Sequence, residues 1–438
     1  MKSRHPRPDD RTWRSWSGLA TARPTQVLSA ASPEEVADAV VAARVQGIGV
    51  KMVGSGHSFP GIAVTDGLLL RPDRLVGIRT VDRDAMTVTV LAATPLHVLD
   101  DRLHRLGLAL HNLGDIDRQT VAGAIATGTH GTGGRVASLS AQVVGVELVT
   151  GDGTLRQVGP GSDLFAAARL GLGATGILTA VTMRVEPAFA LQAVESSMGW
   201  EEVVDRFDEL VAANEHFEAY WFPHTTRLLT KRNNRTAEPL RPLSRTRALL
   251  EDEVLDNGAF EVLNRVGNLA PATIPPLNRL AARALSDRTY SDASHRVLTS
   301  RRRVRFREME HALPREAGIP ALTELRELID RSGWRIGFPV EIRYTPRDDV
   351  WLSPSYGRDS VWLAVHVNAR TDHTTYFAGV ERLLRSYDGR PHWGKLHTRT
   401  AADLAPSYPC FADFLDVRDR VDPDRLFANA YLDRVLGP

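Results

Sequence analysis

Two glycine-rich segments each carry a histidine among small residues. The first is "VGSGHSF" (53–59), and the second is "TVAGAIATGTHGTGG" (120–134). Glycine lets the backbone approach an anion, and backbone N–H groups with Ser and Thr hydroxyls can neutralise a diphosphate without a lysine. A third turn follows at "GLGATGI" (171–177). Each loop alone would also serve as a structural turn, but together the three favour a large dinucleotide cofactor.

The two common nucleotide-binding loops do not fit these segments. A dinucleotide fold of the Rossmann type needs G-x-G-x-x-G between a strand and a helix, but Phe59 stands at the third glycine position. A P-loop needs a lysine followed by Ser or Thr after its second glycine, and none is present.

Five polar residues lie in strand-like or loop segments of the second half. Glu341 and Arg343 in "VEIRY" are two residues apart and therefore face the same side of a strand. Burying such a pair is costly unless it serves a polar pocket. His366 in "AVHVN" shares a strand face with Asn368, and Lys395 in "HWGK" adds a cation.

These polar residues must be positioned by two α+β domains. The first domain (10–190) shows a capped helix at 32–48, a strand at 86–94 and, within 96–110, a helix that ends at Gly107. Two further strands joined by an Asp-Gly turn are expected within 141–158, and a long strand within 171–187. The second domain (191–410) alternates strands and helices, with strands expected around "REMEHA", "VEIRY" and "VWLAVHV" and a helix at 376–387. We expect residues 411–438 to return to the first domain.

Composition limits the remaining possibilities. The chain has 438 residues, a net charge of +1 and one cysteine, Cys410, which excludes an internal disulfide framework and a cysteine metal cluster. We expect no metal and no nucleic acid. No apolar run approaches the roughly 18 residues of a spanning helix, and the N-terminal segment lacks the apolar core of a signal peptide. We therefore expect a cytoplasmic protein, or at most one peripheral to a membrane.

Two arginine-dense segments, 230–247 and 300–308, allow two interpretations. Charge runs usually form a solvated face or an anion-facing loop. The alternative is a patch that docks an electron acceptor or a membrane surface.

"GSGHSF", "GTHGTG" and "GATGI" together resemble the vanillyl-alcohol oxidase superfamily, whose members hold FAD in a PCMH-type domain. The chain is most similar to its sugar-1,4-lactone and alditol oxidoreductases, which act on L-gulono-1,4-lactone, D-arabinono-1,4-lactone or polyols. "EIRYTPRDDVWLSPSYGRDS", "RPHWGKLHT" and "VDPDRLFANAYL" extend the likeness to the C-terminus. The resemblance implies an α+β, two-domain PCMH-type fold and an FAD-dependent oxidoreductase.

For the cofactor, the resemblance implies a bond from the imidazole of His57 to the 8α-methyl carbon of the flavin. A second, cysteinyl tether is not expected, because Cys410 lies near the C-terminus. The remaining residues that the resemblance places at the cofactor are Gly54, Ser55, Gly56, Ser58, Gly114, Thr120, Gly123, Thr127, Gly128, Thr129, His130, Gly131, Gly176, Ile177, Lys395 and Asn429.

For the substrate, the resemblance places Glu341, Arg343, His366 and Lys395 over the flavin. Arg343 and Lys395 would stabilise anionic flavin and substrate oxygen, Glu341 would bind substrate hydroxyls, and the base would be His366, Lys395 or water. Asp115, Asn368 and Glu310 would contact the substrate.

Two positions bear on the reaction. Gly114 stands where a larger residue is thought to block oxygen, so electrons would pass to O₂, or else to a cytochrome or quinone. Asp115 stands where alditol oxidases carry a serine, which favours a lactone. We therefore expect oxidation of a secondary hydroxyl of an aldono-1,4-lactone. The alternatives are an alditol oxidase that produces H₂O₂, a specialised biosynthetic alcohol oxidase, or a flavoprotein without catalysis.

Overall fold

The structure is a computed structural model that describes residues 12–134, 138–244, 266–267, 269–284, 287–300 and 304–438. The expected domain start at residue 10, and parts of both arginine-dense segments, lie outside the described residues.

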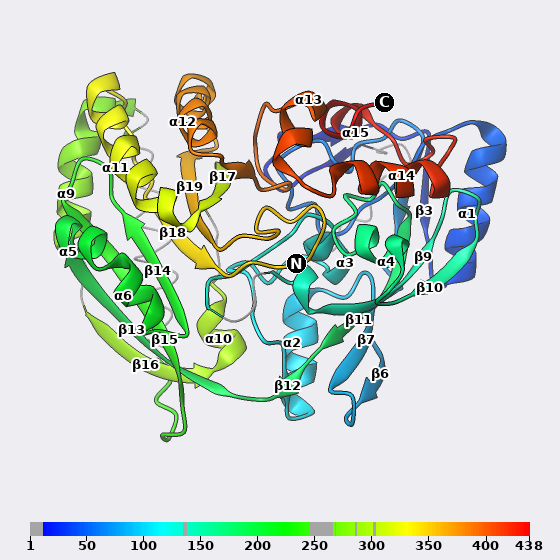
Figure 1. The fold of residues 1–438 in the computed structure, drawn as a ribbon, viewed down its shortest axis with the longest axis horizontal. Helices are drawn as coiled ribbons and strands as arrows, with labels where there is room; N and C mark the ends of the chain where they lie inside the picture. The colour runs from blue at the N-terminus through cyan, green and yellow to red at the C-terminus, as the bar shows by residue number, and fades with distance from the viewer. Residues whose placement is uncertain (1–11, 135–137, 245–265, 268, 285–286, 301–303) are drawn as a thin grey trace, which may run out of the picture.

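The first half holds two sheets beside each other. The small one is parallel, in the order β3–β5–β4, and the larger one is antiparallel, in the order β10–β9–β11–β7–β6 (Figure 1). The strands are β3 (Gln26–Ser29), β4 (Val50–Met52), β5 (Leu68–Arg71), β6 (Ile78–Asp82), β7 (Thr87–Leu91), β9 (Val143–Val149), β10 (Leu155–Val158) and β11 (Ile177–Arg184). The helices are α1 (Pro33–Gln46), α2 (Leu96–Arg105), α3 (Val121–Ala126) and α4 (Asp163–Ala168). Two short pairs, β1 (Trp13–Arg14) with β2 (Thr21–Ala22) and β8 (Leu108–Ala109) with β12 (Glu186–Pro187), complete this half.

Local sequence accounts for the ends of these elements. The Ser32 side chain accepts a hydrogen bond from the Glu35 N–H and caps α1, and Gly47 ends the helix at φ 65°. The helix expected from residue 96 until Gly107 is present as α2 and ends at Arg105, and Leu108–Ala109 then pairs as a strand. The expected Asp-Gly turn is confirmed, because Leu155 pairs with Val149 across it and Gly153 has φ 80°.

The second half is one antiparallel sheet of eight strands, in the order β16–β13–β15–β14–β18–β19–β17–β20. The strands are β13 (Ala190–Gly199), β14 (His216–Trp221), β15 (Arg227–Thr236), β16 (Arg288–Ala293), β17 (Phe306–Pro314), β18 (Val340–Thr345), β19 (Ser360–Asn368) and β20 (Arg390–Pro391). The helices here are α5 (Trp200–Asp205), α6 (Phe207–Ala212), α9 (Ile274–Ala284), α10 (Ser294–Leu298), α11 (Arg315–Ser332) and α12 (Thr374–Ser386).

One face of the eight-stranded sheet is apolar and covered. Phe217, Ile342 and Leu363 pack there against Leu322 and Leu325 of α11 and Phe377 of α12. Because side chains alternate along a strand, the residues between them point to the opposite face. That opposite face is directed toward the first half, since His130 from the glycine-rich loop stacks on Trp362 of β19 with ring centroids 3.7 Å apart.

The chain returns to the first half after β20. Trp393 and Tyr408 pack in one cluster with Ala167 and Leu170 of the first half. Helices α13 (Ala401–Leu404), α14 (Phe411–Val421) and α15 (Ala430–Leu436) lie over that half, drawn in red in Figure 1. The return thus begins near Trp393, so the expected boundary at residue 410 falls within the returning segment.

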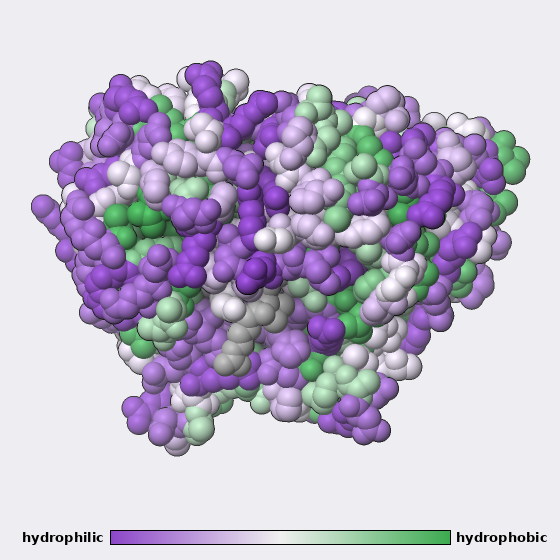
Figure 2. Space-filling model, viewed as in Figure 1, coloured by the Kyte–Doolittle hydropathy of each residue, from purple (hydrophilic) through white to green (hydrophobic). Residues whose placement is uncertain are grey.

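The outer surface of the molecule carries both hydrophilic and hydrophobic residues (Figure 2). Figure 2 shows a face on which hydrophilic residues predominate and hydrophobic residues form separate patches. Of the helices in the described ranges, none combines the length and apolarity needed to cross a bilayer.

Candidate active site

A cavity in the first half is lined by all three glycine-rich segments. Its lining includes these expected cofactor residues: Gly54, Ser55, Gly56, His57, Ser58, Thr120, Gly123, Thr127, Gly176 and Ile177. Residues from Gly171 to Gly173 also contribute. The cavity therefore brings together segments more than a hundred residues apart in the chain.

Small residues are required where these segments meet. A Cβ atom on Gly54 would lie only 2.2 Å from Thr120 Oγ1, so any side chain there would force the first two loops apart. Thr120 itself caps α3 by accepting a hydrogen bond from the Gly123 N–H. Such a cradle of close backbone and hydroxyl groups fits an extended diphosphate cofactor.

His57 lines the cavity near the second half of the molecule. Its ring stacks on Trp16, with centroids 5.7 Å apart and planes at 29°. Burial, with the positive charge of Lys395 adding to it, lowers the pKa of His57 to about 4. The imidazole is therefore neutral near pH 7, which leaves a lone pair on one nitrogen.

The other expected cofactor residues lie behind the cavity lining or beyond it. Thr129 Oγ1 exchanges hydrogen bonds with the Gln119 side chain, which does line the cavity. Asn429 caps α15, and its Nδ2 donates to the carbonyl oxygens of Gly61, Ile62 and Val64, so it supports the cavity wall at Ile62. Gly114, Gly128, Gly131, His130 and Lys395 also stand outside this lining.

The face of the eight-stranded sheet that is directed toward the first half is polar and buried. Strand register places its side chains in adjacent rows: Glu218 is opposite Arg343, and Tyr220 is opposite Glu341. On the neighbouring strands, Glu308 is opposite His366. These strands come from separate parts of the chain, so the sheet alone brings the charges together.

Arg343 forms the centre of the first charge group. Its Nη2 lies 2.5 Å from Glu341 Oε1 and its Nε lies 3.4 Å from Glu218 Oε2, which confirms that Glu341 and Arg343 share a face. Burial disfavours the charged guanidinium, but Glu341 and Glu218 outweigh it and raise the pKa of Arg343 well above its usual value. Arg343 is thus a fixed cation.

Glu308 forms the centre of the second charge group. One of its carboxylate oxygens pairs with Lys395 Nζ, and Oε1 lies 3.4 Å from His366 Nε2. Burial opposes ionisation of Glu308, yet Lys395 and His366 outweigh it and lower its pKa to about 2. The other His366 nitrogen, Nδ1, lies 3.3 Å from the Pro339 carbonyl oxygen. Glu308 therefore orients both candidate bases.

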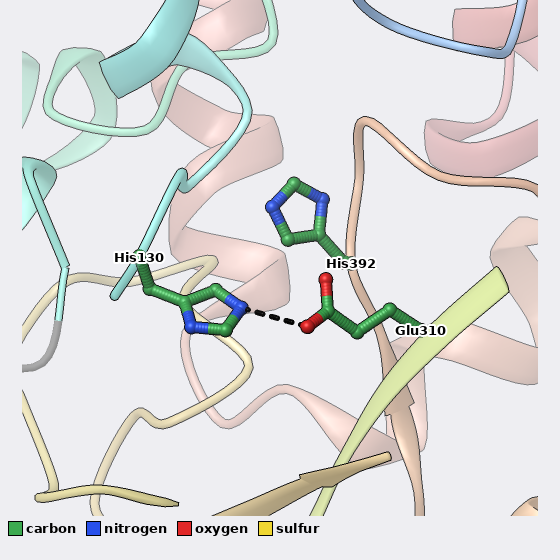
Figure 3. A group of neighbouring side chains, drawn as sticks. All are labelled: His130, Glu310 and His392. Carbon is green, nitrogen blue, oxygen red and sulfur yellow. Dashed lines mark ion pairs between the residues drawn. The ribbon is translucent and has the colours of Figure 1, made fainter. Parts of the chain in front are cut away.

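A third group joins the two halves of the molecule (Figure 3). His130 Nε2 lies 3.3 Å from Glu310 Oε1, and both side chains are almost fully buried. Burial opposes ionisation of Glu310, but His130 outweighs it and lowers the pKa of Glu310 well below its usual value. His392 stands beside the pair, where burial lowers its pKa to about 3.

The third group has the composition of a metal site, and so does the set Glu308, Glu341 and His366. The hydrogen bonds favour an ion pair instead. His130 Nδ1 faces the Gly131 carbonyl oxygen at 2.9 Å and therefore donates, and His392 Nδ1 accepts from the Gly394 N–H at 2.9 Å. Neutral His392 then carries its proton on Nε2, which leaves no lone pair there for a metal.

The expected substrate residues Asp115 and Asn368 are held by local contacts. Asp115 Oδ1 accepts a hydrogen bond of 2.6 Å from Ser300 Oγ. Asn368 Oδ1 accepts from the Arg370 N–H in the turn after β19. Both roles stay predictions.

Sequence reasoning missed Glu308, Glu218 and Lys51. Glu308 lies two residues before Glu310, so strand alternation puts both on the face shared with His366. Pairing of β17 with β19 was the missing information for Glu308. Glu218 gave no local signal, because its partner Arg343 is far away in the chain.

Comparison with known proteins first identifies the class of protein to which the chain belongs. Residues 24–159 match the family model described as FAD binding domain. Cholesterol oxidase from B. sterolicum shares the fold with a TM-score of 0.83 at 19% identity, covering 98% of this chain and 99% of that one. The protein therefore has the PCMH-type FAD-binding fold, as expected, in a two-domain α+β arrangement.

The family follows from the second half and from the full-length relatives. Residues 181–435 match the model described as D-arabinono-1,4-lactone oxidase, and the chain belongs to this family. The L-gulono-1,4-lactone dehydrogenase of Mycobacterium tuberculosis is 40% identical, over 97% of this chain and 99% of the relative. The L-gulonolactone oxidase of Bos taurus is 32% identical over 97% and 98%, and the alditol oxidase of a Streptomyces species is 33% identical over 96% and 98%. The protein is an FAD-dependent oxidoreductase acting on CH–OH donors.

Proposed function

We propose that the substrate is an aldono-1,4-lactone of the L-gulono or D-arabinono type, oxidised at a secondary hydroxyl, at C2. The observation that carries this proposal is the 40% identity, over nearly both whole chains, to a relative named L-gulono-1,4-lactone dehydrogenase. Bound FAD supplies a hydride acceptor at its N5. The second half must then bind the lactone, exclude water and hold charge at the reacting oxygen.

The buried charge groups are suited to these tasks. Arg343 is a cation whose charge is fixed by Glu341 and Glu218, and Lys395 lies in contact with Glu308. Fixed cations in a water-poor site stabilise a developing oxyanion more strongly than solvent does. The proton of the substrate hydroxyl passes to His366 or Lys395, which share Glu308 as a partner.

An anaerobic stopped-flow experiment tests the substrate. We expect L-gulono-1,4-lactone or D-arabinono-1,4-lactone to bleach the flavin at least tenfold faster than xylitol at equal concentration. Arg343→Lys keeps a charge but loses the forked contact with Glu341 and Glu218, so it should slow bleaching without loss of FAD. Faster bleaching by xylitol would support an alditol oxidase, which the 33% identical Streptomyces relative makes the second candidate. Unchanged bleaching in Arg343→Lys would argue against the proposed role of this residue.

We also propose that FAD is attached covalently through His57. The support is its position in the cavity wall and its neutral imidazole. In this attachment an imidazole nitrogen replaces one hydrogen of the 8α-methyl group, and the two electrons released pass to the acceptor. Acid-precipitated protein should give a yellow pellet, and His57→Ala should give a colourless one while still binding FAD. A colourless pellet from the unmodified chain contradicts the bond.

The electron acceptor is proposed to be O₂, with a quinone or cytochrome as the alternative. The support is Gly114, which has no side chain at the position where, by the family resemblance, a larger residue is thought to block oxygen. Hydrogen peroxide formed in step with lactone consumption would support O₂. Reoxidation that needs an added quinone would contradict it.

A further inference from the structure

Lys51 is a buried lysine whose amino group has no hydrogen-bond partner in the part of the chain that the structure describes. Lys51 lies on β4 and is only 3% exposed to solvent. An ammonium group in such a position is costly unless an anion accompanies it. The position therefore calls for a negative charge that the protein itself does not place there.

The nearest carboxylates do not supply that charge. Asp422 at the end of α14 and Asp433 of α15 act on Lys51 through space, but Lys51 Nζ forms no hydrogen bond with either carboxylate among the described residues. Asp422 is occupied by the N–H groups of Leu426 and Phe427. Burial outweighs both carboxylates and lowers the pKa of Lys51 to about 7.

Lys51 also stands out among the residues that line the FAD cavity. The described lining consists of glycines, small and apolar residues, hydroxyl-bearing residues and an amide, with His57 held neutral. Lys51 is the member of this lining that can carry a full positive charge.

We propose that Lys51 is the counter-charge for the diphosphate of FAD. In its oxidised form, FAD carries its formal negative charges on the diphosphate, and the cavity offers them otherwise only neutral donors. Loading the cofactor then satisfies the ammonium and the phosphates together, and a hydrogen bond between two charged groups is about twice as strong as a neutral one.

Because the ammonium form is favoured once the diphosphate is present, cofactor loading should also take up a proton near neutral pH. Asp422 and Asp433 are the carboxylates that act on Lys51 through space, and His57 is another titratable member of the cavity lining. Asp422 already accepts hydrogen bonds from the N–H groups of Leu426 and Phe427, and His57 is neutral at pH 7. Lys51 is thus the group expected to change its protonation.

The test uses the full chain with His57→Ala, so that FAD binding is reversible, and compares it with Lys51→Met and Lys51→Arg in the same background. Apoprotein is titrated with FAD, ADP and adenosine, with flavin fluorescence and thermal shift as readouts. We expect Lys51→Met to weaken both FAD and ADP by about 10- to 100-fold, the range for a lost contact with a charged group. Adenosine binding should not change, and Lys51→Arg should recover most of the affinity.

Lys231→Met is the matched control. Lys231 is also a largely covered lysine, with a side chain 15% exposed, but it lies on β15, donates to the Val297 carbonyl oxygen and is absent from the cavity lining. Its FAD and ADP affinities should equal those of the parent. FAD binding by the parent, measured first, establishes the cofactor independently of Lys51.

A pH series gives a second readout that does not depend on Lys51→Met. Above about pH 7 the parent should lose ADP affinity by up to about tenfold per pH unit until the pKa of the complex is passed. Lys51→Arg stays charged and should show no such loss. Apoprotein of Lys51→Met should unfold at an equal or higher temperature than the parent, because an unpaired buried charge is gone.

Unchanged ADP and FAD affinities in Lys51→Met would overturn the proposal. Weaker FAD with unchanged ADP would overturn it too, since Lys51 would then act on the isoalloxazine half. If Lys51→Met does not fold, an identical pH dependence in the parent and Lys51→Arg overturns it, and a difference between them supports it.

Discussion

Glu308 is the residue on which the two candidate bases depend. It pairs with Lys395 and lies 3.4 Å from His366, and all three stand on or above one face of the eight-stranded sheet. Glu308 thus acts through other residues, as a positioning residue. The amide of glutamine would keep its shape but not its charge.

Glu308→Gln should slow flavin reduction by the lactone about 100-fold or more, the range for disturbing general acid–base catalysis. Stopped-flow reduction measures the rate, and FAD content checks the fold. Glu316→Gln, which changes an exposed glutamate on α11, is the control and should leave the rate unchanged. A rate in Glu308→Gln equal to that control would contradict the role.

The ion pair between Glu308 and Lys395 predicts that the stability of the folded protein depends on pH. The folded-state pKa of Glu308, about 2, lies below the ordinary value, so its contribution is present above pH ~4.3 and lost as pH falls toward 2. The difference in melting temperature between the unmodified protein and Glu308→Gln should therefore shrink in acid. A difference that stays constant from pH 7 to pH 3 would contradict this.

At the scale of single residues, the sequence predicted part of the candidate active site. It gave the shared face of Glu341 and Arg343 and the position of His57 in a glycine loop, because strand alternation and glycine chemistry are local. It could not give Glu218 or Glu308, because their partners come from other strands. It also could not show that Lys51 Nζ has no hydrogen-bond partner among the described residues, because burial depends on tertiary packing.

At the scale of elements, one face of the eight-stranded sheet packs against helices and the other face carries the buried charged side chains. Its apolar face is covered by α11 and α12, and close contact between α11 and β19 depends on Gly318. A Cβ atom there would lie 2.4 Å from Val361 Cβ. Such an approach holds β19, and with it His366, against its covering helix.

Gly318→Ala should therefore destabilise the protein by about 1–3 kcal/mol, because overpacking outweighs the roughly 1 kcal/mol that alanine gains in a helix. Denaturant unfolding measures the change. Gly159→Ala is the control, since a Cβ atom there meets only the Val144 carbonyl oxygen at 3.5 Å, an ordinary contact. Stabilisation by Gly318→Ala would show that α11 can move away from β19 at little cost.

Elements with strong local signals were predicted well from sequence. Helix α1 lies within one or two residues of its expected bounds because Ser32 and Gly47 define both ends. The helix expected from residue 96 until Gly107 ends at Arg105, but the sequence did not predict that Leu108–Ala109 then pairs with β12. That pairing joins residues almost eighty positions apart and is invisible to local periodicity.

At the scale of the whole molecule, the C-terminal segment closes the cofactor half. Asn429 connects α15 to the loop at 61–64 through three donated hydrogen bonds of 2.9–3.1 Å. Ile62 and Ala63 of that loop line the FAD cavity. The end of the chain therefore holds part of the cavity wall.

Asn429→Ala should lower stability by about 1 kcal/mol through the lost helix cap, and also speed FAD release in a His57→Ala background. Thermal unfolding and the rate of flavin fluorescence increase measure the two effects. Ser32→Ala removes a comparable cap from α1 at a distance from the cavity, so it should change stability alone. Equal FAD release in both variants would contradict a role for Asn429 in the wall.

The sequence indicated that the chain returns, but placed the return at residue 411. The structure begins it near Trp393, whose indole packs beside Tyr408 with ring centroids 5.2 Å apart. The sequence around a buried aromatic residue does not show which hydrophobic core it packs in. Composition therefore could not locate the residue at which the chain returns to the first half.

The core that contains Trp393 can be completed only after the residues from Trp393 onward have been synthesised. While the ribosome is still translating the eight-stranded sheet, the nascent first half lacks the aromatic residues that cover Ala167 and Leu170. Those apolar surfaces stay exposed until the last helices emerge, so a chaperone has a long interval in which to bind them. Loss of the segment from Trp393 onward would therefore uncover Ala167 and Leu170 and also remove the contacts of Asn429 with the cavity wall.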